Sequence, residues 1–327
     1  MTAKIVPVPY DPELEAELPA VRSRLGSDRP LSVETIADSR RRFANLSPDL
    51  ETVIAGRPVE YEDRVVPGPK RDPDIEVSIV RPAGGTSGAP GVYSIHGGGM
   101  VIGTRFFGIG GLVEMALEYG AVGVAVEYRL APENPHPAPS EDCYAGLVWM
   151  AEHAEGLGVD PNKIIVSGGS AGGGLSAAVA LMSRDRGGPR LAGQLLNCPM
   201  IDDRNETISS QQYDGIGLWD RNSNHVGWTA LLGDARGGPG VSPYAAPARA
   251  TDLSGLPPAY IEVGAAEVFR DEDVDYATGI WATGGQAELH VWSGCFHGFG
   301  AFVPEATVSK AAAAARRSWL RRVFGAE

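Results

Sequence analysis

The chain has 327 residues, of which 43% are hydrophobic and 21% charged, and its formal net charge is −13. This composition is typical of a soluble globular protein, and the length suits one large domain or two ordinary ones. The acidic surplus offers no clustered positive surface for a nucleic-acid backbone or for anionic lipid, so we expect neither nucleic acid nor membrane as a partner.

The first 20 residues contain no apolar core, so no signal peptide is expected, and no run approaches the roughly 18 apolar residues that span a bilayer. The three cysteines, Cys143, Cys198 and Cys295, are widely spaced and have apolar or aromatic neighbours. We expect them to be buried free thiols. Together these features predict a cytoplasmic protein.

Helical patterns without strand signals occupy the chain up to about residue 55, as in SVETIADSRRRFANL at 32–46. Two alternating stretches, 59–68 and 74–82, then predict an antiparallel strand pair. Six short apolar runs follow, typical of strands buried on both faces: 91–96, 121–128, 163–168, 191–199, 258–264 and 287–292. The remaining pattern predicts helices at 144–158, 175–185, 274–283 and 308–324.

Strands that alternate with helices predict an α/β fold with a mostly parallel central sheet flanked by helices on both faces. The alternation lapses between about 200 and 250. An insertion after a strand's C-terminal end lies where ligands bind in such sheets. We therefore expect a single domain over 1–327, with a helical cap contributed by about 1–55 and 200–245.

Ser170 lies in a glycine-rich stretch, KIIVSGGSAGGG at 163–174. A flexible linker would not join a β-branched run directly to an alanine-rich helix, and a phosphate-binding loop would need a lysine that is absent here. The stretch does contain G-x-S-x-G between a predicted strand and a predicted helix. This context predicts a nucleophile elbow, a sharp turn that raises the serine hydroxyl above the sheet edge.

The sequence HGGG at 96–99 directly follows the predicted strand GVYSI. Consecutive glycines let bare backbone amides approach a substrate oxygen, so this stretch predicts an oxyanion hole. His96 precedes the serine in the chain, and we expect it to hold the loop by hydrogen bonding rather than to act as a base.

A serine nucleophile needs a histidine base and an orienting acid, and both are expected near the C-terminus. His297 follows the last predicted strand and is favoured over His290, which lies inside that strand. For the acid, Glu267 follows the strand 258–264 by three residues, and Asp271 is the alternative. The other histidines, His136, His153 and His225, are expected on the surface or the cap, and no histidine or cysteine spacing predicts a metal site.

Five ordered motifs resemble the hormone-sensitive-lipase family of α/β-hydrolases, the bacterial family IV carboxylesterases. They are HGGGM (96–100), EYRLAPENPHPAPSEDC (127–143), GGSAGGG (168–174), EVFRDEDVDYA (267–277) and FHGF (296–299). The resemblance implies Ser170 as nucleophile, His297 as general base and then acid, and oxyanion donors from the amides of Gly98, Gly99 and Ala171. It implies no cofactor.

Two positions depart from the pattern of that family. Gly169 stands where the family usually has Asp before the serine, and Glu267 stands where its catalytic acid is usually Asp. A glutamate can serve, because the acid only orients and stabilises the imidazolium. Its extra methylene requires a different approach to the histidine, which keeps Asp271 open.

The motifs together predict a serine carboxylester hydrolase acting on small or medium acyl esters. Lactone or amide hydrolysis, or deacetylation of a specialised metabolite, would use the same triad, and a non-catalytic ligand receptor is the remaining alternative. Six bulky side chains could line a substrate pocket or serve as ordinary cap packing: Met100, Phe106, Phe107, Tyr213, Trp219 and Trp228. Pairing of the strand 287–292 between two copies would give a homodimer.

Overall fold

The computed structural model describes residues 5–26, 31–45 and 50–326. Within these residues eight strands form one sheet, in the order β1-β2-β4-β3-β5-β6-β7-β8. The strands are β1 (Val59–Val66), β2 (Ile75–Pro82), β3 (Ala89–Ile95), β4 (Val122–Glu127), β5 (Val159–Gly169), β6 (Gly193–Asn197), β7 (Ala259–Gly264) and β8 (Ala287–Trp292).

The direction of the strands matches the pattern of the sequence. The alternating stretches form the antiparallel pair β1–β2, in register from Val59 opposite Pro82 to Val66 opposite Ile75. β2 also runs antiparallel to β4, whereas every pair from β4 to β8 is parallel. The predicted α/β fold with a mostly parallel sheet is therefore confirmed.

Helices connect the parallel strands and extend beyond them at both ends of the chain. They are α1 (Pro12–Leu25), α2 (Ile36–Ala44), α3 (Leu50–Ile54), α4 (Ile109–Tyr119), α5 (Ala138–Glu152), α6 (Ala154–Leu157), α7 (Ala171–Asp185), α8 (Ile208–Gln212), α9 (Arg221–Leu232), α10 (Arg270–Ala282), α11 (Phe299–Phe302) and α12 (Thr307–Phe324). The pattern at 32–46 forms a short 3₁₀ turn and α2, and its last residue lies outside the described residues. Helix α4 was not predicted, because Gly110 and Gly111 in its first turn weaken the helical pattern.

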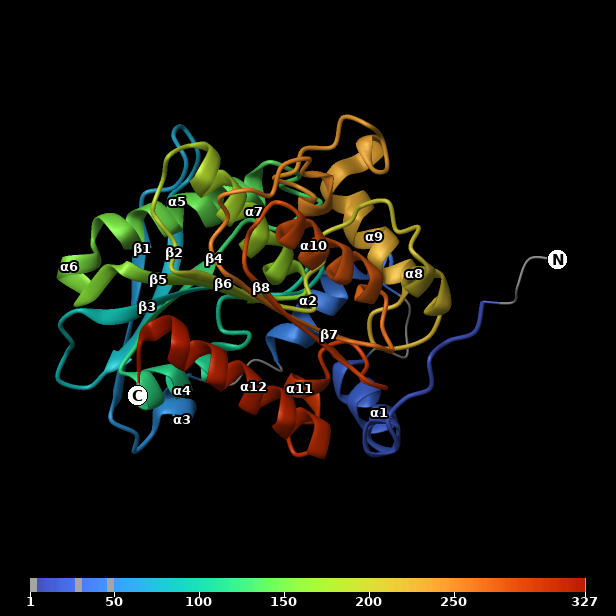
Figure 1. The fold of residues 1–327 in the computed structure, drawn as a ribbon, viewed down its shortest axis with the longest axis horizontal. Coiled ribbons are helices and arrows are strands. Elements are labelled where there is room, and N and C mark those ends of the chain that lie inside the picture. Colours follow the sequence, from blue (N-terminus) through green and yellow to red (C-terminus); the bar gives the residue numbers. More distant parts are fainter. Residues whose placement is uncertain (1–4, 27–30, 46–49, 327) are drawn as a thin grey trace.

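The two faces of the sheet are covered by different helices (Figure 1). On β5, Ile164 and Val166 belong to the core shared with α5, α7 and α10, whereas Ile165 belongs to the core shared with α4 and α12. Successive side chains on a strand point to opposite faces, so a strand buried on both faces reads as a continuous apolar run. Ser167 shares the face of Ile165 on this alternation.

Helices α1 and α2 and the insertion after β6 lie beside the C-terminal ends of the strands, whereas α3 lies next to α4 (Figure 1). Leu14 and Leu18 of α1 pack with Phe296 and Phe299, the residues that flank His297. Helices α8 and α9 belong to the insertion. In the described part of the chain, no helix combines the length and the apolar character needed to cross a bilayer.

Candidate active site

The turn between β5 and α7 holds Ser170 in an unusual backbone conformation. Its φ is 56° and its ψ is −125°, a combination that is unfavourable for a residue with a side chain. Two backbone hydrogen bonds fix this conformation: the Ser170 amide donates to the Asn197 carbonyl at 2.9 Å, and the Ser170 carbonyl accepts from the Met200 amide at 2.9 Å. The neighbouring core thus stabilises a strained residue at the sheet edge.

Glycines on either side of Ser170 allow the turn to pack against the strand β3. A Cβ at Gly168 would lie 2.3 Å from the Gly172 carbonyl oxygen, and a Cβ at Gly172 would lie 2.1 Å from the Ile95 carbonyl oxygen. Both contacts are too short for any side chain. The G-x-S-x-G spacing is therefore a steric requirement of this turn.

His297 and Ser170 are 127 residues apart in the chain and adjacent in the fold. The Ser170 hydroxyl donates to His297 Nε2 at 3.0 Å. The imidazole is 8% exposed, and Phe269 packs edge-on against it with ring centroids 5.1 Å apart. His297 is thus placed to accept the proton of the serine.

Glu267 contacts the other nitrogen of His297. His297 Nδ1 donates to Glu267 Oε2 at 2.5 Å, and the Gly264 amide donates to Glu267 Oε1 at 2.9 Å. The carboxylate is almost wholly buried, at 2% exposure. Both oxygens of Glu267 therefore have partners that fix the orientation of the histidine.

Asp271, the alternative acid, is directed elsewhere. Its carboxylate accepts from the Ser209 amide at 2.8 Å and from Arg270 Nε at 2.7 Å. These contacts join the start of α10 to α8. Asp271 thus links two helices, whereas Glu267 contacts His297.

The predicted oxyanion donors converge on the same end of the sheet. Ala171 is the first residue of α7, so its amide has no acceptor within that helix. Among the described residues, no acceptor within the chain takes a hydrogen bond from the amides of Gly98 or Gly99. Gly98 has φ 118° and Gly99 has φ 61°, and a Cβ at Gly99 would lie 2.2 Å from the Trp219 ring. The conformation and the crowding both require glycine here.

His96 makes its contacts with the loop and with Tyr128, whereas the Ser170 hydroxyl bonds to His297. Its Nδ1 donates to the Gly97 carbonyl at 2.8 Å, and its ring stacks on Tyr128 with centroids 4.2 Å apart. Burial lowers the pKa of His96 to about 4, so the ring is neutral at ordinary pH. His290 is also away from the triad, since its Nε2 lies 3.0 Å from Glu288 and its ring stacks on Trp292.

Ser170 and His297 open onto a cavity of about 620 Å³. Leu25 and Phe43 from the N-terminal segment and Trp219 from the insertion line it, together with Phe107. This volume lies within the usual range for small-molecule sites. Both predicted cap segments thus contribute to its wall.

Four of the six expected pocket residues do not line this cavity: Met100, Phe106, Tyr213 and Trp228. Met100 is fully buried, and its side chain approaches α7 near Gly174. Tyr213 is buried, and its hydroxyl donates to the Val8 carbonyl at 2.8 Å. Phe106 packs with α4 beneath the Arg105 guanidinium, 4.5 Å from the ring centroid. Trp228 is fully buried in the core. Trp219 and Phe107 line the cavity, and the other four residues pack elsewhere.

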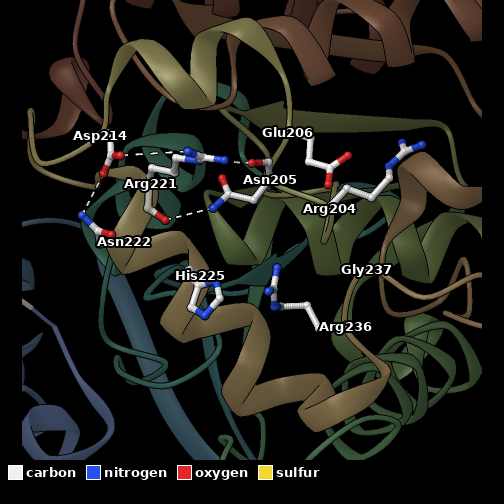
Figure 2. Close-up of a pocket in the computed structure, with 9 residues that line it drawn as sticks. All are labelled: Arg204, Asn205, Glu206, Asp214, Arg221, Asn222, His225, Arg236 and Gly237. Carbon is white, nitrogen blue, oxygen red and sulfur yellow. Dashed lines mark hydrogen bonds and ion pairs between the residues drawn. The ribbon is translucent and has the colours of Figure 1, made fainter.

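A second cavity, of about 470 Å³, lies on the insertion and is polar (Figure 2). Arg204, Arg221 and Arg236 line it with His225, but no serine or cysteine is among its lining residues. Arg204 pairs with Asp202 at 2.7 Å, and Arg221 lies 3.9 Å from Asp214. This cavity contains no residue of the predicted triad.

Folding also brings Cys198 beside the triad, which the spacing of the sequence did not indicate. Cys198, Glu267 and His297 each place one potential metal-ligating atom within 4.8 Å of the others. The Glu267 and His297 atoms already bond to each other, and burial raises the pKa of the Cys198 thiol well above its usual value. The three cysteines are free and buried, as expected.

The chain belongs to the family described as alpha/beta hydrolase fold, which matches residues 92–301. It is 36% identical over 230 residues to the esterase LipI of Mycobacterium tuberculosis, covering 67% of this chain and 69% of that protein. It is 35% identical over 275 residues to the carboxylesterase NlhH of the same species, covering 81% of each. The resemblance to the hormone-sensitive-lipase group is thereby confirmed.

Solved structures agree with this assignment. A bacterial heroin esterase superposes with a TM-score of 0.88 at 37% identity, covering 96% of this chain and 98% of that one. The hyperthermophilic esterase of the archaeon Pyrobaculum calidifontis superposes with a TM-score of 0.84 at 31% identity, covering 96% and 98% respectively.

Proposed function

We propose that the chain is a serine carboxylesterase that cleaves small or medium acyl esters. The observation that carries this proposal is the continuous set of contacts Ser170–His297–Glu267, with distances of 3.0 Å and 2.5 Å. Relatives at 35% and 36% identity are named carboxylesterase and esterase, which supports ester hydrolysis as the reaction.

The reaction begins when the Ser170 hydroxyl attacks the ester carbonyl and passes its proton to His297 Nε2. Glu267 holds the imidazole in the required tautomer and stabilises the imidazolium that forms. The developing oxyanion accepts hydrogen bonds from the amides of Gly98, Gly99 and Ala171. One such donor typically contributes about 2.7–4 kcal/mol of transition-state stabilisation.

His297 then protonates the leaving alcohol, which departs and leaves an acyl group on Ser170. A water molecule gives a proton to His297 and attacks the acyl carbonyl, and the collapse of the second tetrahedral intermediate releases the acid and restores the serine. Each step uses these side chains, backbone amides and water. No cofactor enters the proposed sequence.

The two segments 1–55 and 200–245 act as the cap in this proposal. Leu25, Phe43 and Trp219 bring apolar surface from both segments to the cavity that Ser170 lines. An apolar wall and a volume of about 620 Å³ suit short or medium acyl chains. The free, buried cysteines accord with a cytoplasmic location, which we include in the proposal.

The experiment is the hydrolysis of p-nitrophenyl acetate and butyrate by the wild type and by Ser170→Ala. We expect kcat to fall by about 10⁴-fold or more, because the remaining triad residues cannot replace the nucleophile. Circular dichroism should give the same spectrum for both proteins. Turnover that survives the substitution would contradict the mechanism.

A further inference from the structure

Gly169 stands where the family usually has Asp, and the sheet register shows which residues lie beside it. Gly169 of β5 pairs with Asn197 of β6, and Asn197 pairs with Glu262 of β7. Neighbouring strands lie about 4.8 Å apart, so the backbone positions of Asn197 and Glu262 are about 5 Å and 10 Å from Gly169. The three positions form a row that starts beside the nucleophile.

A second row lies two residues earlier on the same face. Ser94 pairs with Ser167, and Ser167 pairs with Leu195. All members of both rows line the cavity that contains Ser170 and His297. Apart from Leu195 and Gly169, these residues are polar, which is unusual for the buried face of a parallel sheet. The cavity therefore has an apolar wall at the cap and a polar wall on the sheet.

The absence of a side chain at Gly169 leaves space between Ser170 and this polar wall. A Cβ at Gly169 would contact only Asn197, at an ordinary 3.7 Å, and a longer side chain would extend into the cavity. Gly169 is not among the residues with positive φ, so its backbone does not require glycine. Glycine at this position thus leaves space rather than relieving strain.

The polar wall contains atoms that have no partner within the described chain. They are Asn197 Oδ1, a hydrogen-bond acceptor, and Arg316 Nε, a donor, and both are buried. Arg316 lines the same cavity, and its Nη2 donates to Glu262 Oε1 at 2.7 Å. The Tyr260 hydroxyl donates to Glu262 Oε2 at 3.0 Å. Both oxygens of Glu262 therefore have partners, whereas Asn197 Oδ1 and Arg316 Nε have none within the described chain. Buried polar atoms rarely lack partners in folded proteins.

We propose that this polar wall is a subsite for a hydroxyl group carried on one arm of the ester. A hydroxyl both donates and accepts hydrogen bonds, so it suits a wall that is lined by the side chains of Ser94, Ser167 and Asn197. The Arg316–Glu262 pair has no net charge, which favours a neutral substituent over a carboxylate. The inference rests on the proposed function, and it names hydroxylated esters with an arm of about six carbons as the preferred substrate class.

The experiment compares matched esters on each side of the ester bond by acid release in a pH-stat. Methyl 6-hydroxyhexanoate against methyl hexanoate tests the acyl arm, and 6-hydroxyhexyl acetate against hexyl acetate tests the alcohol arm. We expect the wild type to prefer the hydroxylated member of one pair by about 5- to 10-fold in kcat/KM. Methyl acetate is too short to reach the polar wall and serves as the reference for every variant.

Three variants test the assignment. In Asn197→Leu and in the double variant Glu262→Gln/Arg316→Met, the hydroxyl preference should disappear relative to methyl acetate. The double variant leaves no buried carboxylate without its cation. Gly169→Val should instead slow the hydrolysis of both six-carbon esters relative to methyl acetate, because its side chain fills the space between Ser170 and the polar wall. Arg317→Met, on the exposed side of the same helix, is the matched control and should behave as the wild type.

Equal or poorer use of the hydroxylated esters by the wild type would overturn the subsite, as would a preference that survives both polar-wall variants. Either result is distinct from a failure of the proposed function. If the proposed function were wrong, Ser170→Ala would keep its activity on methyl acetate, whatever the outcome with the six-carbon esters. Thermal unfolding of each variant, compared with the wild type, checks that the folded protein is being measured.

Discussion

At the scale of single residues, the sequence leaves two candidates for the acid that contacts His297, and the structure distinguishes them. Glu267 and Asp271 lie four residues apart, and both follow β7 closely enough to approach His297. The turn after β7 separates them: the Gly264 amide anchors Glu267 under His297, while Asp271 binds the Ser209 amide of α8. The second set of contacts comes from a distant segment, which no local pattern could reveal.

This arrangement predicts different effects for two amide substitutions. Glu267→Gln should lower kcat by roughly 10³-fold, because an amide cannot stabilise the imidazolium and can favour the wrong tautomer. Asp271→Asn keeps most of its hydrogen bonds and should change kcat by less than about 3-fold. Steady-state kinetics with p-nitrophenyl butyrate measures both. Collapse of kcat in Asp271→Asn alone would assign the acid to Asp271.

Met100, Phe106 and Tyr213 mark the limit of residue-level prediction in the pocket. Each was expected at the substrate pocket, but its side chain packs in the core instead. Met100 has φ 64°, so the turn after the glycines points its side chain away from the cavity. Side-chain direction in an irregular loop depends on such dihedral angles, and composition does not report them.

At the scale of elements, helix α10 packs the carboxyl groups of Glu272 and Asp273 into the core. Glu272 Oε1 accepts from the amides of Ile201 and Asp202 at 3.0 and 3.1 Å, and the residue is 3% exposed. Burial is the main cause that raises the pKa of Glu272 well above 4.5, and the neighbouring Asp202 adds to it. Acids near a helix N-terminus are usually exposed, so the sequence alone does not indicate that Glu272 is buried.

The raised pKa of Glu272 predicts how stability depends on pH. The folded state retains a proton that the unfolded state loses above its ordinary pKa near 4.5, so the stabilising contribution is present below that pH and declines as the pH rises. Glu272→Gln keeps an acceptor for both amides and removes this titration. Its free energy of unfolding should therefore exceed that of the wild type at pH 8, and the difference should shrink toward pH 5.

Urea unfolding at pH 5 and pH 8 measures that difference. Asp275→Asn is a suitable control, because Asp275 is an exposed acid on the same helix. A difference between Glu272→Gln and the wild type that does not change with pH would mean that Glu272 ionises normally in the folded protein.

At the scale of the whole molecule, the sheet and most of the helices packed on it were predictable, with α4 as an exception, and the walls of the site were only partly so. All eight strands appear as apolar or alternating runs, because burial on two faces or one leaves a direct pattern in the residues. The cavity wall instead combines Leu25, Trp219 and Arg316, which lie far apart in the chain. Their convergence depends on how the cap segments and α12 pack, and that packing has no short-range signature.

We propose that two copies pair through β8, the last strand in the sheet order. β8 bonds to β7 on one side, and Val291 on this strand is 42% exposed. An open edge of this kind can pair with a second copy, and a lysine on it opposes pairing. Light scattering should give a dimer mass for the wild type and a monomer mass for Val291→Lys. Val65→Lys, on the edge strand β1 at the opposite end, should remain dimeric, and a monomeric wild type would contradict the proposal.

The central claim is that Ser170 is an activated nucleophile, and covalent labelling tests it most directly. A fluorophosphonate probe should add one adduct to the wild type, located by peptide mass spectrometry on the segment that contains Ser170. Glu267→Gln should label more slowly, because its histidine is a weaker base, and Ser170→Ala should not label. An unlabelled wild type, or an adduct on another residue that persists in Ser170→Ala, would contradict the account.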